Sequence, residues 1–171
     1  FDTPVIIKMV TRVAHSQSLV ETGERAVPEQ KPYEKNIQKY VMMPGNAIRR
    51  HPIVEERLRK LTEYAEASPL NRIEDGEDKS VGFITSSTSY QYVKEVMGDK
   101  HPVLKLGLVN PLPVEMIKKF AAAVDKVIVV EELDPIIETH CRNIGVEVQG
   151  KEIFGLLGEF SQNFVAEKLG K

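Results

Sequence analysis

Three carboxylates stand together at the end of the most apolar run in the chain. Val127–Val130 is followed directly by Glu131, Glu132 and Asp134, and then by Pro135. Carboxylates in pairs can act as general acid and base or hold a hard divalent cation. Neighbouring side chains at a strand end point to opposite sides, however, so these two glutamates are poorly placed to share one proton. The pair Asp134-Pro135 also has the form of a helix N-cap and first helical residue, so we expect capping and interface roles.

A run of hydroxyl side chains follows another apolar segment, at Thr85, Ser86, Ser87, Thr88 and Ser89. The free N–H groups and the dipole at a helix N-terminus favour an anion, so the first four residues are candidate anion ligands. The run has neither the glycines of a dinucleotide fingerprint nor the Gly-Lys-Ser/Thr ending of a phosphate-binding loop. Plain capping of the following helix is the alternative.

Two further residues, Arg12 and His15, lie in a polar stretch after an apolar segment. An arginine could bind a substrate carboxylate and a neutral histidine could donate a hydrogen bond, although a surface role is the alternative. The single cysteine, Cys141, excludes an internal disulfide and a thiolate-bound cluster built by this chain alone. The sequence offers no metal site.

The elements that must position these residues alternate along the chain. Four branched apolar residues in a row at Val127–Val130 predict a strand buried on both faces, which is typical of parallel sheets. Because strands and helices alternate at short spacings, we expect an α/β fold, a three-layer sandwich with an open, mostly parallel sheet. The other predicted strands are residues 5–10, 81–85, 103–109 and, at an edge, 146–148; the predicted helices are residues 52–68, 86–96, 116–124, 136–144 and 161–169.

Three regions are predicted. Residues 1–20 carry the N-terminal strand, residues 21–79 form a linker and a connecting helix, and residues 80–171 form the α/β domain. Glycines and prolines punctuate the linker, at Gly23, Pro28, Pro32, Pro44 and Gly45. Since the sequence opens at a phenylalanine and runs straight into an apolar segment, we expect a piece of a longer polypeptide.

Composition narrows the class of protein. Of 171 residues, 42% are hydrophobic and 28% charged, and the net charge is -2. This balance is ordinary for a globular protein and argues against a nucleic-acid partner. No apolar run approaches the roughly 20 residues needed to span a bilayer, and no secretory segment is present. We therefore expect a cytoplasmic protein with no membrane association.

Several strings, taken in order, resemble the 2-oxoacid:ferredoxin oxidoreductases, and their spacing is similar to that of the large (alpha) subunits of the indolepyruvate type. The first is similar to the end of the family's thiamine-pyrimidine domain, the next two to the connector, and the rest to its transketolase-C-terminal-like domain. Ser87 departs from the family pattern, which has glycine there. The strings are residues 3–16 (TPVIIKMVTRVAHS), 40–47 (YVMMPGNA), 49–51 (RRH), 84–86 (ITS), 89–95 (SYQYVKE), 104–107 (LKLG), 110–113 (NPLP) and 129–135 (VVEELDP).

The resemblance implies an enzyme that oxidatively decarboxylates arylpyruvates such as indolepyruvate to aryl-acetyl-CoA and reduces ferredoxin. It implies thiamine diphosphate, Mg²⁺ and iron–sulfur clusters in the full enzyme. It also implies a hetero-oligomer of the remaining domains of the subunit with a small (beta) subunit, which uses coenzyme A and ferredoxin.

Within that enzyme, the loop with Thr11, Arg12 and His15 would lie nearest the cofactor. The region as a whole would serve as scaffold and interface, with no catalytic residue or bound cofactor of its own and no activity alone. Two alternatives stay open: a small nucleotide- or CoA-binding module, and the same domain of another thiamine-dependent enzyme.

Overall fold

The computed structural model describes residues 1–171, which divide into two compact units, Phe1–Arg57 and Leu58–Lys171. The first unit contains two single-turn helices, α1 (Thr11–Ala14) and α2 (Ile37–Tyr40), and the start of α3 (Pro44–Ala67). None of its residues is buried. The predicted strand at residues 5–10 is wrong: the segment pairs with no other strand, and Ile6 is 92% exposed. Strand-forming residues alone do not make a strand, because it needs a neighbour and a covering layer.

Helix α3 begins eight residues earlier than the predicted start at Pro52, which lies inside it. Its first residue is Pro44, a position where the missing N–H of proline costs nothing. The carbonyl of Met43 accepts the N–H groups of Asn46 and Ala47, both at 2.9 Å. The prediction of a helix ending near Ser68 is confirmed, but the wrong proline was assigned to its first turn.

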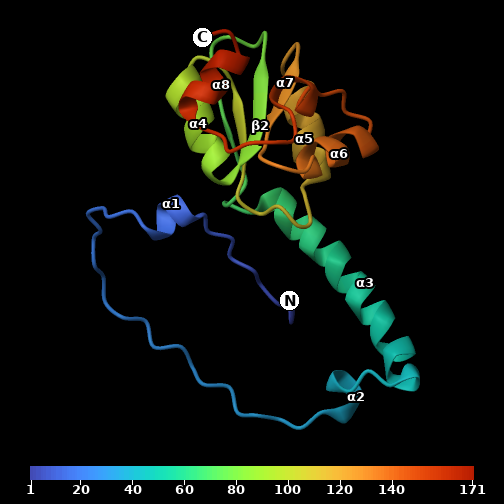
Figure 1. Ribbon diagram of the computed structural model, residues 1–171. Helices are drawn as coiled ribbons and strands as arrows, with labels where there is room; N and C mark the ends of the chain where they lie inside the picture. Colours follow the sequence, from blue (N-terminus) through green and yellow to red (C-terminus); the bar gives the residue numbers. More distant parts are fainter. The chain divides into compact units, whose positions relative to one another are not determined.

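The second unit is built on a four-stranded sheet in the order β1-β3-β2-β4 (Figure 1). Strand β2 runs parallel to both of its neighbours, β3 and β4, whereas β1 pairs with β3 in the antiparallel sense. The open, mostly parallel sheet expected from the sequence is therefore confirmed. The strands are β1 (Arg72–Glu74), β2 (Gly82–Ser86), β3 (Val103–Leu106) and β4 (Val127–Val130).

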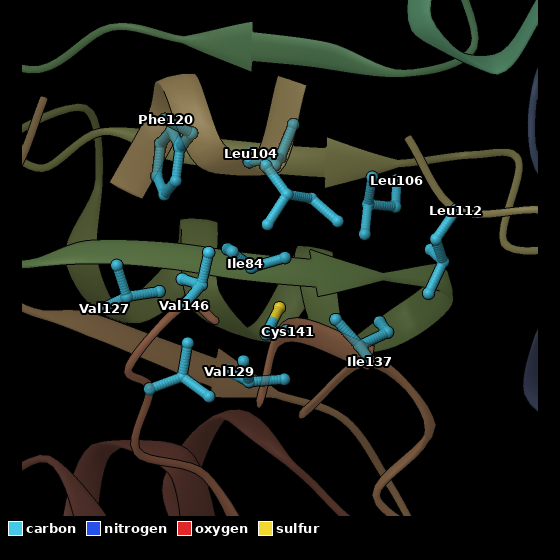
Figure 2. Close-up of a cluster of buried hydrophobic side chains, with 12 residues drawn as sticks. Ile84, Leu104, Leu106, Leu112, Phe120, Val127, Val129, Ile137, Cys141 and Val146 are labelled. Atoms are coloured by element: carbon cyan, nitrogen blue, oxygen red, sulfur yellow. The ribbon is translucent and has the colours of Figure 1, made fainter. Parts of the chain in front are cut away.

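Helices cover both faces of this sheet, which confirms the three-layer sandwich. Figure 1 shows α4 (Ser87–Met97) and α8 (Gln162–Lys168) on one side and α5 (Val114–Ala121) and α6 (Ile136–Asn143) on the other. Adjacent residues of β2 serve opposite cores: Phe83 packs with the first pair of helices and Ile84 with the second. Figure 2 shows the second core, where Ile84, Leu104 and Val129 lie with Ile137 and Cys141.

Three details of this unit differ from the expectation. Strand β1 was not predicted, and neither was the short helix α7 (Lys151–Phe154). Residues 146–148 do not form the predicted edge strand. The chain instead makes a single parallel bridge beside β4, where Gln149 accepts the N–H of Val129 at 2.7 Å and donates to the carbonyl of Val127 at 3.0 Å.

Candidate functional site

Strands β2, β3 and β4 are parallel, so their carboxyl ends meet at one edge of the sheet, where open α/β proteins bind their ligands. Two of the predicted groups come together here. Thr85 lies opposite Val130 in the pairing of β2 with β4, and its Oγ1 donates to the carbonyl of Val130 at 2.8 Å. The hydroxyl run after β2 and the carboxylates after β4 are therefore neighbours. We call this edge the carboxyl edge.

Glu131 is the most buried of the three carboxylates. Only 8% of its surface is exposed, and its two oxygens accept the N–H groups of Ile137 at 2.8 Å and Glu138 at 3.0 Å. These donors belong to the first turn of α6, which a side chain or water must satisfy. Burial raises the pKa of Glu131 above its ordinary value, against the lowering influence of the two N–H donors. The carboxylate is thus a helix cap.

Asp134 does not have the capping role that the sequence suggested. The N-cap position of α6 belongs to Pro135, no side chain from that position caps the helix, and Asp134 is exposed. Glu131, three residues earlier, reaches the first turn of α6 because it directly follows the end of β4. Helix α5 is capped in the same way by a distant carboxylate, since Glu66 accepts the N–H groups of Glu115 and Met116, both at 2.9 Å.

Sequence reasoning missed a second buried carboxylate, Glu138. One of its oxygens accepts the N–H of Lys151 at 2.8 Å, and the other pairs with Nη2 of Arg142 at 2.6 Å. The Nζ of Lys151 donates to the carbonyl of Glu131 at 2.5 Å, and burial lowers the pKa of this lysine. The pair with Arg142 is local, but no local signal could have found the contacts of Lys151, because it is separated from Glu138 by 13 positions and from Glu131 by 20.

Glu132 binds a different segment of the chain from the one that Glu131 binds. Its Oε1 accepts the N–H of Phe160 at 2.5 Å, which ties the loop after α7 to the loop after β4. Leu133 follows in the left-handed region, with φ of 58°. The three carboxylates therefore do not converge on one point, and the arrangement provides neither a shared proton nor a cation site.

The hydroxyl run differs from a plain set of helix caps. Thr85 is fully buried and its hydroxyl is bonded to Val130. Ser86 occupies the N-cap position of α4, but its side chain makes no capping hydrogen bond. Ser87 is exposed and has φ of 52°, a conformation that favours glycine. The first turn of α4 is thus without a side-chain cap from its N-cap residue, and Thr88 lies half-buried within it.

The residues Thr11, Arg12 and His15 belong to the other unit, Phe1–Arg57. Thr11 and Arg12 begin the single turn of α1, and His15 is its C-cap residue, with its N–H bonded to the carbonyl of Thr11 at 2.9 Å. All three are exposed. They stand on one helical turn, not in the loop that the sequence suggested.

The chain has no metal-binding cluster and no helix that could span a membrane. No group of three or more histidine, cysteine, aspartate or glutamate side chains is arranged to hold a metal ion. Cys141 is buried in the core, where burial raises the pKa of its thiol to about 12. Thiolate is the ligand form of cysteine, so this residue is a poor metal ligand. None of the helices combines the length and the apolar character that crossing a bilayer requires.

Sequence comparison with known proteins finds relatives of this chain. No protein-family model matches it. It is 38% identical over 159 residues, 88% of its length, to the indolepyruvate oxidoreductase subunit IorA of Archaeoglobus fulgidus. It is 33% identical, over an alignment of 183 positions that covers 98% of its length, to the subunit of the same name from Pyrococcus horikoshii. These alignments cover 25% and 28% of the two relatives, so the chain spans about a quarter of their length.

A solved structure supports the fold. A 2-oxoglutarate:ferredoxin oxidoreductase from Magnetococcus marinus, with 2-oxoglutarate, coenzyme A and succinyl-CoA bound, superposes with a TM-score of 0.57. The sequence identity is 21%, and the match covers 75% of this chain and 23% of that one. The architecture is therefore that of one region of such an enzyme. The aligned relatives identify the chain as a member of the family of IorA subunits of indolepyruvate oxidoreductase.

Proposed function

We propose that this chain is a scaffold and interface region of an enzyme that oxidatively decarboxylates arylpyruvates. In the full enzyme, indolepyruvate would be converted to the aryl-acetyl-CoA and the electrons would pass to ferredoxin. The observation that carries the proposal is the 38% identity to an indolepyruvate oxidoreductase subunit along 88% of the chain. The carboxyl edge supports the scaffold role, because its buried carboxylates are occupied with helix N–H groups.

The three regions expected from the sequence belong to this proposal. Residues 1–20 would end the thiamine-pyrimidine domain, residues 21–79 would be the linker and connecting helix, and residues 80–171 the transketolase-C-terminal-like domain. The sheet strands β2, β3 and β4 all fall in the last region. Strand β1 pairs with β3 from within the linker range, so the linker would also contribute to the sheet.

The full enzyme would hold thiamine diphosphate, Mg²⁺ and iron–sulfur clusters, and the residues of this chain fit none of them alone. A cluster needs several thiolates, whereas Cys141 is a single thiol whose pKa burial raises to about 12. Thr11, Arg12 and His15 are exposed on one turn and form no enclosed pocket among themselves. When bound, thiamine diphosphate would supply the carbanion chemistry of decarboxylation. This chain's part would be to supply those three residues, at the end of the thiamine-pyrimidine domain, as the ones nearest the cofactor.

The partners would be the remaining domains of the subunit, a small (beta) subunit, coenzyme A and ferredoxin, in a cytoplasmic hetero-oligomer. Two printed names support this part of the proposal: the relatives are described as subunits, and the structural neighbour has coenzyme A bound.

The substrate class is tested by competition. The full subunit is purified with its small subunit, supplied with equal concentrations of indolepyruvate, pyruvate and 2-oxoglutarate together with coenzyme A and an electron acceptor, and the acyl-CoA products are separated by mass. We expect indoleacetyl-CoA to predominate. Predominance of succinyl-CoA or acetyl-CoA would keep the 2-oxoacid family role and contradict the arylpyruvate assignment.

A second candidate function is binding of a nucleotide or coenzyme A by the hydroxyl run. The observation that favours it is the first turn of α4, which receives no capping bond from the side chain of its N-cap residue.

A further inference from the structure

Six of the nine exposed large apolar side chains of the Leu58–Lys171 unit lie at the carboxyl edge, and the other three, Leu58, Tyr64 and Ile73, lie on α3 and β1. Val109 follows β3, Leu133 and Ile136 follow β4, and Leu70 accepts the N–H of Gly107 beside the end of β3. The bond from Phe160 to Glu132 brings the loop with Leu156 and Leu157 to the same edge. We call the set the apolar edge: Leu70, Val109, Leu133, Ile136, Leu156 and Leu157, all exposed.

The opposite edge of the sheet has a different surface. Its loops, residues 75–81, 98–102 and 122–126, contribute no exposed large apolar side chain. They expose charged residues instead, including Asp75, Lys79, Asp99 and Lys126. Single exposed apolar residues are ordinary, but six of them gathered at one edge mark an interaction surface.

The loop that carries the two leucines is held at both ends. Phe154 and Phe160 are buried, with their ring centroids 5.6 Å apart. Between them, Gly155 and Gly158 adopt φ angles of 73° and 93°, which glycine reaches without steric penalty. The chain therefore leaves the core and returns within a few residues, and Leu157 at its tip is 88% exposed. Because the anchors are fixed, this leucine is presented to a partner with little loss of conformational freedom.

The apolar edge is also hollowed. A cavity of about 360 Å³ lies between the loop after β3 and helix α6, with Val109, Leu112 and Ile136 among its lining residues. The lining contains no aspartate, glutamate, lysine or arginine, and its one titratable side chain is His140, whose pKa is lowered by burial. A cavity of this size and polarity suits one large apolar side chain of a partner, the kind of anchor that dominates the energy of protein interfaces.

The charges near the projecting leucines indicate the partner's chemistry. Glu132, Asp134 and Glu152 lie in the loops and helix that flank Leu133 and Leu157. The one nearby cation on these segments, Lys151, is bound through its Nζ to the carbonyl of Glu131. The surroundings are thus negative, and complementary interfaces place positive side chains opposite such a surface.

We propose that the apolar edge docks on a protein surface of the same assembly that offers an apolar groove flanked by lysine or arginine and inserts one large apolar side chain into the cavity. The inference rests on the proposed function only in taking this chain as one region of a larger enzyme. It assigns to the carboxyl edge a protein partner in place of a small ligand.

The test uses the full subunit purified with its small subunit. A photo-reactive phenylalanine derivative replaces Leu157 in one preparation and Lys126, on the opposite edge, in a matched control. We expect efficient cross-linking from position 157 to a peptide that contains apolar residues next to lysine or arginine, and little from position 126. Equal yields from the two positions, or a cross-linked peptide without basic residues, would overturn the proposal. So would loss of the cross-link on addition of coenzyme A, which would assign the edge to a small ligand.

Two variants supply an independent readout. In these preparations the photo-reactive phenylalanine derivative replaces Leu156, and docking is measured as the yield of the cross-link from that position. Leu157→Asp should reduce the yield about tenfold, as truncation of a buried anchor does. Asp134→Lys should also reduce it, and high salt should diminish this effect because the repulsion is between exposed charges. Lys126→Glu is the control and should change nothing; equal losses in all three would overturn the proposal.

Activity separates this inference from the proposed function. A preparation that oxidises 2-oxoacids but gives no cross-link from position 157 contradicts the inference alone. A preparation that cross-links as expected but oxidises no 2-oxoacid contradicts the proposed function alone.

Discussion

The Nζ of Lys151 donates a hydrogen bond to the main-chain carbonyl of Glu131 at 2.5 Å, while the carboxylate of the same glutamate holds the first turn of α6. The backbone N–H of Lys151 is in turn bound by Glu138, from that first turn. One segment after β4 thereby fixes the start of two helices. This network accounts for buried carboxylates at a sheet edge without any catalytic role.

The capping role of Glu131 can be tested by replacing its side chain. Glu131→Ala leaves the N–H groups of Ile137 and Glu138 buried without an acceptor, and we expect a loss of about 1–3 kcal/mol in the free energy of unfolding at neutral pH. Asp134→Asn, at an exposed position, should change it by less than about 0.5 kcal/mol. Urea unfolding of the chain followed by circular dichroism measures both. Equal losses in the two variants would show that α6 is not capped by Glu131.

The pH dependence of stability should carry the signature of the same residue. Burial raises the pKa of Glu131, so the folded chain retains this proton at a higher pH than the unfolded chain does. The contribution of this proton to the free energy of unfolding is complete below the pKa of the unfolded state. It is lost as pH rises through the pKa of the folded state. The stability of the wild type relative to Glu131→Gln should therefore fall as pH increases from about 4 toward neutrality. Unfolding curves at a series of pH values measure the difference, and a rise with pH would contradict the assignment.

Gly150 tests the position of Glu138. A Cβ at residue 150 would clash with Oε2 of Glu138, the atom that accepts the N–H of Lys151. Gly150→Ala should therefore destabilise the chain by about 1–3 kcal/mol, as overpacking does. Gly45 lies in α3 with nothing within 4 Å of its added Cβ, so Gly45→Ala should be neutral or stabilise by up to about 1 kcal/mol. A neutral Gly150→Ala would mean that Glu138 has another rotamer.

The hydroxyl run at Thr85, Ser86, Ser87 and Thr88 remains a predicted anion site, and titration calorimetry with inorganic phosphate and with coenzyme A tests it. If the first turn of α4 binds the anion, Ser87→Glu should weaken binding at least about tenfold through like-charge repulsion at the helix N-terminus. Ser87→Gly should preserve it and relieve the left-handed strain of about 1 kcal/mol. No heat at millimolar ligand, or equal affinity in Ser87→Glu, would remove the site from consideration.

Sequence patterns predicted the α/β fold because its central strands carry their own signal. Val127–Val130 is apolar at every position, and only a strand covered on both faces accommodates that. Arg72–Glu74 has no such signal: two of its three residues are charged, and it is a strand because β3 offers an edge for pairing. Residues 5–10 have the composition of a strand and no neighbour, so composition alone misled.

The chemistry of the carboxyl edge was also less predictable, because it depends on which segments lie next to one another in the fold. Local sequence favoured Asp134 as the cap of α6, because aspartate before proline is a common helix start. In the structure, Glu131 is the cap instead, since its position at the end of β4 brings the carboxylate to the N–H groups of Ile137 and Glu138. The partnership of Glu138 with Lys151 depends on where the chain returns after α6 and had no sequence signal.

The central claim is that this chain belongs to an enzyme that oxidises 2-oxoacids in the presence of coenzyme A. The most direct measurement is the rate of ferredoxin reduction by the full subunit purified with its small subunit, given indolepyruvate and coenzyme A under anaerobic conditions. We predict rapid reduction that requires both compounds and that stops when either is omitted. Absence of reduction with indolepyruvate and with every other 2-oxoacid tried, in a preparation loaded with thiamine diphosphate and iron–sulfur clusters, would contradict the account.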